Sequence, residues 1–133
     1  MSAINFNVET LVYPGVFPRG HPRCTQKPTD RLEIVVNKYV PRNNPQAKTG
    51  DVTLILLHAN GFHKVHSLKL DRADGKELYE PFFDAILEKS GKAGFRIRAI
   101  WAQDIANQGA SGVRNEDKLG DMGIVLIHLL EWN

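Results

Sequence analysis

The sequence predicts an α/β fold, in which strands of a mostly parallel sheet are joined through one or two helices. The run VTLILLH, residues 52–58, is apolar almost throughout, as in a strand that is buried on both faces of a parallel sheet. Apolar residues then recur at helical spacing over residues 78–87, and FRIRAIWA, residues 95–102, alternates like a strand. Because parallel strands need a crossover of this kind, the order strand, helix, strand predicts a βαβ unit.

The segment before this unit is expected to divide into an irregular arm and one strand. Four prolines and two glycines fall between Tyr13 and Thr29, a density that breaks helices and sheet ladders alike. Residues 1–30 are therefore expected to form an irregular N-terminal arm. In RLEIVVNKYV, residues 31–40, apolar side chains alternate and β-branched residues dominate, which predicts a partly buried strand of the antiparallel type.

The helix and the segment after the last strand carry their own boundary signals. Pro81 is best tolerated in a first helical turn, so the helix is expected to begin near Tyr79 or Glu80, and Gly91 is expected to end it. Residues 103–123, QDIANQGASGVRNEDKLGDMG, are polar and rich in glycine, which predicts a long loop. A loop of this length in a compact domain is either functional or unfinished.

The composition is that of a single soluble globular domain. The chain has 133 residues, 42% hydrophobic and 24% charged, which argues against disorder and against a fibrous protein. The net charge is +2 and the basic residues are scattered, so no nucleic-acid partner is expected. The apolar run at residues 124–130 is too short to span a membrane, and the N-terminus does not resemble a secretory signal. An intracellular protein is expected, with Cys24 as an ordinary thiol.

The candidate site is HANGF, residues 58–62, which directly follows the first strand of the βαβ unit. Open α/β sheets bind ligands at the carboxyl ends of their strands. The small residues Ala59 and Gly61 let the backbone approach a ligand closely, and a turn of this kind can direct N–H groups at a developing oxyanion. A plain Asn-Gly turn after a strand has the same spacing, so the residues alone leave both interpretations open.

Two further patterns do not predict a site. His58, His63 and His66 have no acidic residue or cysteine at ligand spacing beside them, so no metal site is expected. The segment GASGV, residues 109–113, nearly matches the nucleophile elbow G-x-S-x-G, but its second glycine comes one position early and no buried strand leads into it. Ser111 is therefore expected to lie in a flexible loop and not to act as a nucleophile.

Taken with the proline-rich arm, three segments resemble the N-terminal part of a fungal α/β-hydrolase: GDVTLILLHANGF, ELYEPFFDAILE and RAIWAQDIANQGASGVRNEDKLGDM. The resemblance is to the AB hydrolase-1 type, in the group that includes toxin-biosynthesis-type hydrolases and a peroxisomal lipase. It covers residues 18–64 and 77–122. It implies an incomplete α/β-hydrolase fold, with residues 52–58 as the third strand of the sheet.

The resemblance also implies a role for the turn after this strand. In the family, a backbone N–H of that turn forms one half of the oxyanion hole. By position in the motif Asn60 is the expected donor, with Gly61 and Phe62 beside it and His58 shaping the turn. The implied enzyme hydrolyses an ester or lipid-like small molecule without a metal or an organic cofactor, in the cytoplasm or the peroxisome.

In the α/β-hydrolase order the nucleophile, acid and histidine follow the segments present here. The chain is therefore expected to be a truncated hydrolase domain, 1–133, that is inactive alone. The alternative is a non-catalytic interaction module whose apolar tail, residues 124–130, pairs with a partner. A G-x-S-x-G elbow in the downstream genomic frame would favour the enzyme, and the oligomeric state is left open by either interpretation.

Two segments depart from the family pattern. Family members pass from HANGF to KELYEP almost directly, and removal of residues 65–76 from this chain restores HANGFHKELYEPFF. These residues are therefore interpreted as an inserted loop, encoded by a short in-frame intron that was retained. The tail GIVLIHLLEWN, residues 123–133, is also atypical, and we interpret it as a second case of intron read-through.

The retained-intron hypothesis predicts the transcript. Sequencing of cDNA across codons 60–80 and 118–133 is expected to find molecules that lack codons 65–76 and continue past codon 122 in a different frame or exon. Genomic DNA amplified with the same primers is the control for length. A population of transcripts that uniformly contains codons 65–76 would contradict the hypothesis.

Overall fold

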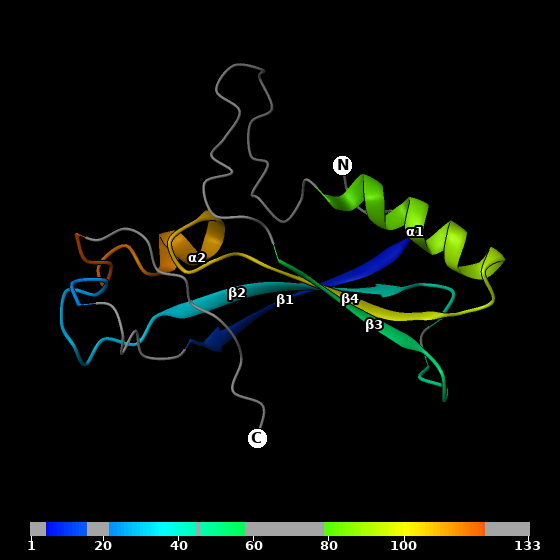
Figure 1. Cartoon of the computed structure of the whole chain (residues 1–133), viewed down its shortest axis with the longest axis horizontal. Coiled ribbons are helices and arrows are strands. Elements are labelled where there is room, and N and C mark those ends of the chain that lie inside the picture. The colour runs from blue at the N-terminus through cyan, green and yellow to red at the C-terminus, as the bar shows by residue number, and fades with distance from the viewer. Residues whose placement is uncertain (1–4, 16–21, 45, 58–78, 122–133) are drawn as a thin grey trace, which may run out of the picture.

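A computed structural model of the chain describes residues 5–15, 22–44, 46–57 and 79–121. These residues form the strands β1 (Phe6–Pro14), β2 (Glu33–Pro41), β3 (Val52–Leu57) and β4 (Ile97–Gln103), and the helices α1 (Glu80–Lys92) and α2 (Gly109–Arg114). The strands make one sheet in the order β1-β2-β4-β3, with α1 lying across one face (Figure 1). The architecture is α/β, as the sequence predicts.

The sheet is mixed. β2 is antiparallel to both of its neighbours, β1 and β4, whereas β3 and β4 are parallel. Helix α1 lies between β3 and β4 in the chain, so these three elements form the expected βαβ unit. The strand predicted at residues 31–40 and the strand predicted at residues 95–102 correspond to β2 and β4, each displaced by one or two residues.

The predicted irregular arm, residues 1–30, is wrong in its first part. Residues Phe6–Pro14 form β1, which pairs with β2 along its whole length. The prolines that suggested an arm begin only at Pro14, the last residue of this strand, and an edge strand tolerates proline there. Residues 22–30 are irregular as expected, and backbone hydrogen bonds from Gln26 to Lys118 and from Gly120 to Cys24 hold them in place.

The expected burial of β3 on both faces is also wrong. Leu54 and Leu56 pack against the cluster under α1, but Ile55 and Leu57, on the other face, are 59% and 55% exposed. The strand lies at the edge of the described sheet, and within that part of the chain no helix covers its second face. An uninterrupted apolar run reports composition only, and whether both faces are covered depends on elements elsewhere in the chain.

The main core lies between α1 and the sheet and is built on three aromatic rings. Phe83 of α1 contacts Tyr39 of β2 edge to face, with ring centroids 4.8 Å apart, and Phe6 of β1 completes the group. All three side chains are almost completely buried. A bulge in β4 places one extra residue opposite the start of β3, and Ile97 and Ile100 therefore both face this cluster.

Helix α1 begins where the sequence predicts. Tyr79 is its N-cap and Pro81 stands in its first turn, where a missing N–H costs no hydrogen bond. The helix passes through Gly91 and ends at Lys92. Gly94 follows with a φ of +82°, a conformation that glycine adopts without steric cost, and this residue turns the chain towards β4.

We expect the two adjacent phenylalanines of α1 to contribute very differently to stability. Phe83→Ala removes a fully buried ring and should lower the free energy of unfolding by about 3 to 5 kcal/mol, or prevent folding outright. Phe82→Ala, at a side chain that is 53% exposed, is the matched control and should cost less than about 1 kcal/mol. Urea unfolding followed by circular dichroism measures both, and equal losses would contradict the assignment of the core.

Candidate functional site

The parallel strands β3 and β4 end side by side, which places the candidate site at their common carboxyl edge. Leu57, the last residue of β3, is in register with Gln103, the last residue of β4. His58 is the next residue after Leu57 in the chain. The expected site residues His58, Asn60, Gly61 and Phe62 all lie outside the described residues, so their roles stay predictions.

Other sequence-based expectations also fall outside the described residues. The histidines His63 and His66, the proposed insert at residues 65–76 and the tail at residues 123–133 belong to this group. In the part of the chain that the structure describes, no three His, Cys, Asp or Glu side chains gather as they would around a metal ion. Cys24 is buried and forms no disulfide.

The segment after β4 is not the long loop that the sequence predicts, because it contains α2 and this helix completes an edge of β2. β4 pairs with β2 only from Val36 to Tyr39, which leaves the backbone of Glu33 and Val35 without a strand on that side. Asn115, directly after α2, pairs with the backbone of Glu33 in place of a strand. Glu33 N–H donates to Asn115 Oδ1, and Asn115 Nδ2 donates to the Glu33 carbonyl, both at 2.8 Å. The side-chain amide thus pairs with β2 as a peptide group of a neighbouring strand would.

Ser111 pairs with the backbone of Val35 in the same way, which corrects the expectation that it lies in a flexible loop. Its side chain is fully buried; Oγ accepts a hydrogen bond from Val35 N–H at 2.8 Å and donates one to the carbonyl of Asp104 at 3.1 Å. The N–H of Asp104 in turn donates to the carbonyl of Val35 at 3.0 Å. Ser111 is therefore committed to the backbone on both sides, and this environment is that of a structural serine.

Close steric contacts explain why glycine stands at both ends of the GASG segment. Gly109 has a φ of +54°, and a β-carbon there would lie 2.7 Å from the carboxyl group of Asp104. A β-carbon on Gly112 would lie 2.8 Å from the backbone of Asn107. Both approaches are too close for any side chain, so the glycines allow α2 to pack tightly against the turn that follows β4. The likeness to a nucleophile elbow therefore arises from the packing of a helix.

Charges reinforce the contact between α2 and β2. One carboxylate oxygen of Asp104 accepts a hydrogen bond from Ala110 N–H at 3.0 Å, in the first turn of α2. Arg114, in the last turn, forms an ion pair with Glu33 at 3.1 Å. The exposed ion pair contributes little by itself. The sequence carried one signal for this helix: Ser111 and Asn115 are four residues apart, a spacing that places two hydrogen-bonding side chains on the same face of a helix.

The arrangement gives the candidate site a rigid border. The turn after β4 is fixed to β2 by the Asp104, Ser111 and Asn115 hydrogen bonds, and β3 ends beside it. Leu57, the last described residue of this part of the chain, is held in register by β4, which in turn pairs with β2. Such a platform can hold backbone N–H groups in a fixed orientation, which is the requirement for stabilising a developing negative charge.

Comparison with curated proteins finds similar sequences in fungi. The chain is 35% identical over 119 residues to a type I acyl-CoA thioesterase, mpaH, of Penicillium roqueforti. It is equally similar to the type I acyl-CoA thioesterase mpaH′ of Penicillium brevicompactum. Each match covers 90% of this chain and 24% of the relative, so the chain spans about a quarter of the length of these proteins.

Comparison with solved structures finds the same fold. The peroxisomal α/β-hydrolase Lpx1 of Saccharomyces cerevisiae superposes with a TM-score of 0.64 and a sequence identity of 24%. The match covers 88% of this chain and 29% of that protein. No family model matches the sequence. Among the described residues, no helix has the length and apolar character needed to cross a membrane.

We expect Ser111 to act in folding and not as a nucleophile. Ser111→Ala leaves the buried Val35 N–H without its partner and should lower the free energy of unfolding by about 1 to 3 kcal/mol. Val113→Ala, at an exposed residue of the same helix, should change it by less than about 0.5 kcal/mol. A fluorophosphonate probe should label neither the parent chain nor the variants, and labelling that disappears in Ser111→Ala would contradict the structural role.

Proposed function

Because this chain belongs to the fungal α/β-hydrolase family, we propose that residues 52–62 supply one half of the oxyanion hole of an enzyme that hydrolyses acyl esters or thioesters. The observation that supports this proposal is the common carboxyl edge of β3 and β4, with Leu57 and Gln103 in register at its border. The segment HANGF follows Leu57 directly in the chain, and α/β folds bind ligands at this edge of the sheet.

The proposed chemistry is the stabilisation of a tetrahedral intermediate. When a nucleophile attacks an acyl carbonyl, the oxygen becomes negatively charged and needs N–H donors about 3 Å away. In the α/β-hydrolase fold, one donor comes from the residue after the nucleophile and the other from the loop between the third strand and the next helix. The backbone N–H of Asn60 is our candidate for the second donor, with Gly61 and Phe62 beside it and His58 shaping the turn.

The substrate class follows from the carbonyl chemistry and from the relatives. Two of the similar proteins are named as acyl-CoA thioesterases. Oxygen esters and thioesters pass through the same kind of oxyanion, so one backbone donor serves both. We therefore propose an acyl ester or thioester of a small molecule as the substrate of the complete enzyme. The proposed mechanism needs no metal ion and no organic cofactor.

The 133-residue chain alone is proposed to be inactive. Hydrolysis needs a nucleophile that is activated by a histidine, and in this fold both follow the strands described here in the order of the chain. Ser111, the serine in the segment most like an elbow, accepts from Val35 and donates to Asp104, and is not available for attack. An oxyanion donor without a nucleophile stabilises no intermediate, and so gives no turnover.

A chimera tests the role of the turn. Residues 22–64 and 77–121 of this chain, joined directly, replace the matching segment of the P. roqueforti thioesterase, and hydrolysis of an acyl-CoA is measured. In an active chimera, Asn60→Pro removes the backbone N–H and should lower kcat by a factor of about 10² to 10³. Asn60→Ala keeps that N–H and should retain most of the activity.

The controls separate the two parts of the proposal. Equal activity of the Asn60→Pro and Asn60→Ala chimeras would show that the N–H of this residue is not the donor. The 133-residue chain is assayed in parallel with p-nitrophenyl esters and acyl-CoA, and no turnover above the Ser111→Ala variant is expected. Saturable turnover by the parent chain would contradict its proposed inactivity.

A further inference from the structure

Tyr39 of β2 contacts two residues in the first turn of α1, one through its ring and one through its hydroxyl group. The ring packs edge to face against Phe83, with centroids 4.8 Å apart. The hydroxyl donates a hydrogen bond to a carboxylate oxygen of Glu80 at 3.2 Å. Glu80 and Phe83 are three residues apart, so both lie on the face of α1 that meets the sheet. One fully buried side chain therefore holds the start of the helix at two points.

These two contacts restrict different movements of the helix. Burial of apolar surface has no preferred direction, so the ring contact sets how closely α1 approaches the sheet but tolerates small rotations. A hydrogen bond weakens steeply as its angle departs from the optimum, so the contact from Tyr39 to Glu80 opposes rotation of α1 about its own axis. A buried O–H group that loses its acceptor also raises the free energy of the folded chain.

A chain of polar groups orients the Tyr39 hydroxyl towards the helix. Thr10 of β1 donates a hydrogen bond to Asn37 Oδ1 at 2.9 Å, and Asn37 Nδ2 donates to the Tyr39 hydroxyl at 3.3 Å. Thr10 and Asn37 are in register in the two paired strands, and Asn37 is almost completely buried. The polar chain thus runs from an outer strand of the described sheet through β2 to α1, along the face that the helix covers.

The turn that Tyr39 holds is joined directly to the segment that contains the candidate site. Residues 58–78 follow Leu57, which β4 holds in register at the end of β3. They lead to the first turn of α1, which the contact between Tyr39 and Glu80 holds. When both ends of a chain segment are fixed, fewer backbone conformations are open to the residues between them.

We propose that Tyr39 and Glu80 are positioning residues for the oxyanion donor, because they fix the turn of α1 to which the donor's segment is joined. This inference rests on the function proposed above for residues 52–62. Neither side chain needs to touch the substrate. A misplacement of about 1 Å can cost up to about 10²-fold in rate, and an oxyanion donor acts mainly in the transition state. Loss of the anchor should therefore lower kcat and leave KM nearly unchanged.

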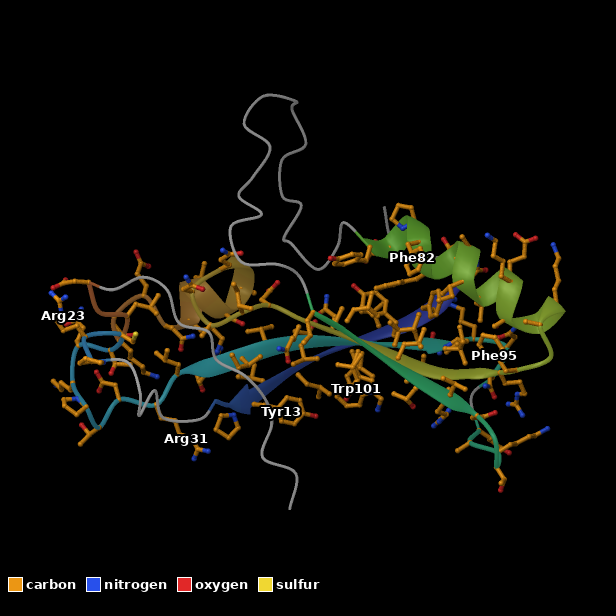
Figure 2. The ribbon with its side chains drawn as sticks, in the orientation of Figure 1. Tyr13, Arg23, Arg31, Phe82, Phe95 and Trp101 are labelled. Carbon is orange, nitrogen blue, oxygen red and sulfur yellow. The ribbon has the colours of Figure 1, made fainter. Side chains whose placement is uncertain are left out.

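Hydrogen exchange of the full 133-residue chain, followed by NMR, tests the anchor without enzyme activity. Tyr39→Phe keeps the ring and removes only the hydroxyl. The amides of Asp84 and Ala85, the first to be hydrogen-bonded within α1, should then exchange about three- to tenfold faster, with little change in the last turn. Tyr13→Phe is the matched control, because Tyr13 lies beside Trp101 on the face of the sheet away from α1 (Figure 2). It should leave exchange in α1 unchanged.

The thioesterase chimera, extended to begin at residue 5 of this chain so that β1 is included, tests the positioning role. Glu80→Ala should lower kcat for acyl-CoA about tenfold and change KM less than about twofold. Glu80→Gln keeps a side-chain carbonyl as acceptor and should restore most of kcat. Asp84→Ala is the matched control. This carboxylate lies one turn further along α1 and accepts a hydrogen bond from Asn5, and its loss should leave kcat unchanged.

The results separate this inference from the proposed function. No rise of exchange in the first turn of α1, or an equal rise along the whole helix, would show that the hydroxyl does not anchor the helix and would overturn the inference. Equal kcat values for the Glu80→Ala and Asp84→Ala chimeras would overturn it as well. If Asn60→Pro and Asn60→Ala are equally active but Glu80→Ala lowers kcat, Asn60 is not the donor, and the anchor positions another group of the same site.

Discussion

The backbone of β2 has more hydrogen-bonding groups on one edge than β4 can pair, and the structure depends on how this mismatch is resolved. β4 leaves β2 after Gln103, whereas β2 continues back to Glu33. Unpaired backbone groups at a partly buried position are costly, so the chain must supply another partner. Asn115 and Ser111 supply it, and α2 is fixed where it lies because its side chains act as the missing strand. The turn after β4, and with it the carboxyl edge of the sheet, is fixed by the same contacts.

The sequence allowed the prediction of features that depend on local pattern. The start of α1 could be located from Pro81, and β2 and β4 from alternation, because each signal lies within the element that it defines. β1 was missed because prolines and glycines between Tyr13 and Thr29 dominated the interpretation of the whole arm. Residues Phe6–Pro14 form a strand because β2 pairs with them along their whole length. This pairing joins distant parts of the chain, so no local pattern in the sequence reveals it.

The difference between local patterns and contacts with distant residues also explains the wrong predictions around the site. α2 was predicted as a loop because Gly109 and Gly112 are weak helix formers, and the helix forms through packing against Asp104 and Asn107. The exposure of β3 could not be predicted either, since an apolar run does not specify its position in the sheet. The segment HANGF is a different case: it follows Leu57 in the chain but lies outside the described residues, and the roles of Asn60 and its neighbours rest on the family resemblance.

The edge of β3 that faces away from β4 has no partner strand among the described residues, and it carries neither a charge nor a proline. Such an edge accepts a further strand readily, because nothing on it hinders pairing. The similar thioesterases are about four times as long as the region that matches this chain. The oxyanion role that we propose for the residues after Leu57 depends in the same way on the complete enzyme, because an oxyanion donor has an effect only where a nucleophile attacks the carbonyl.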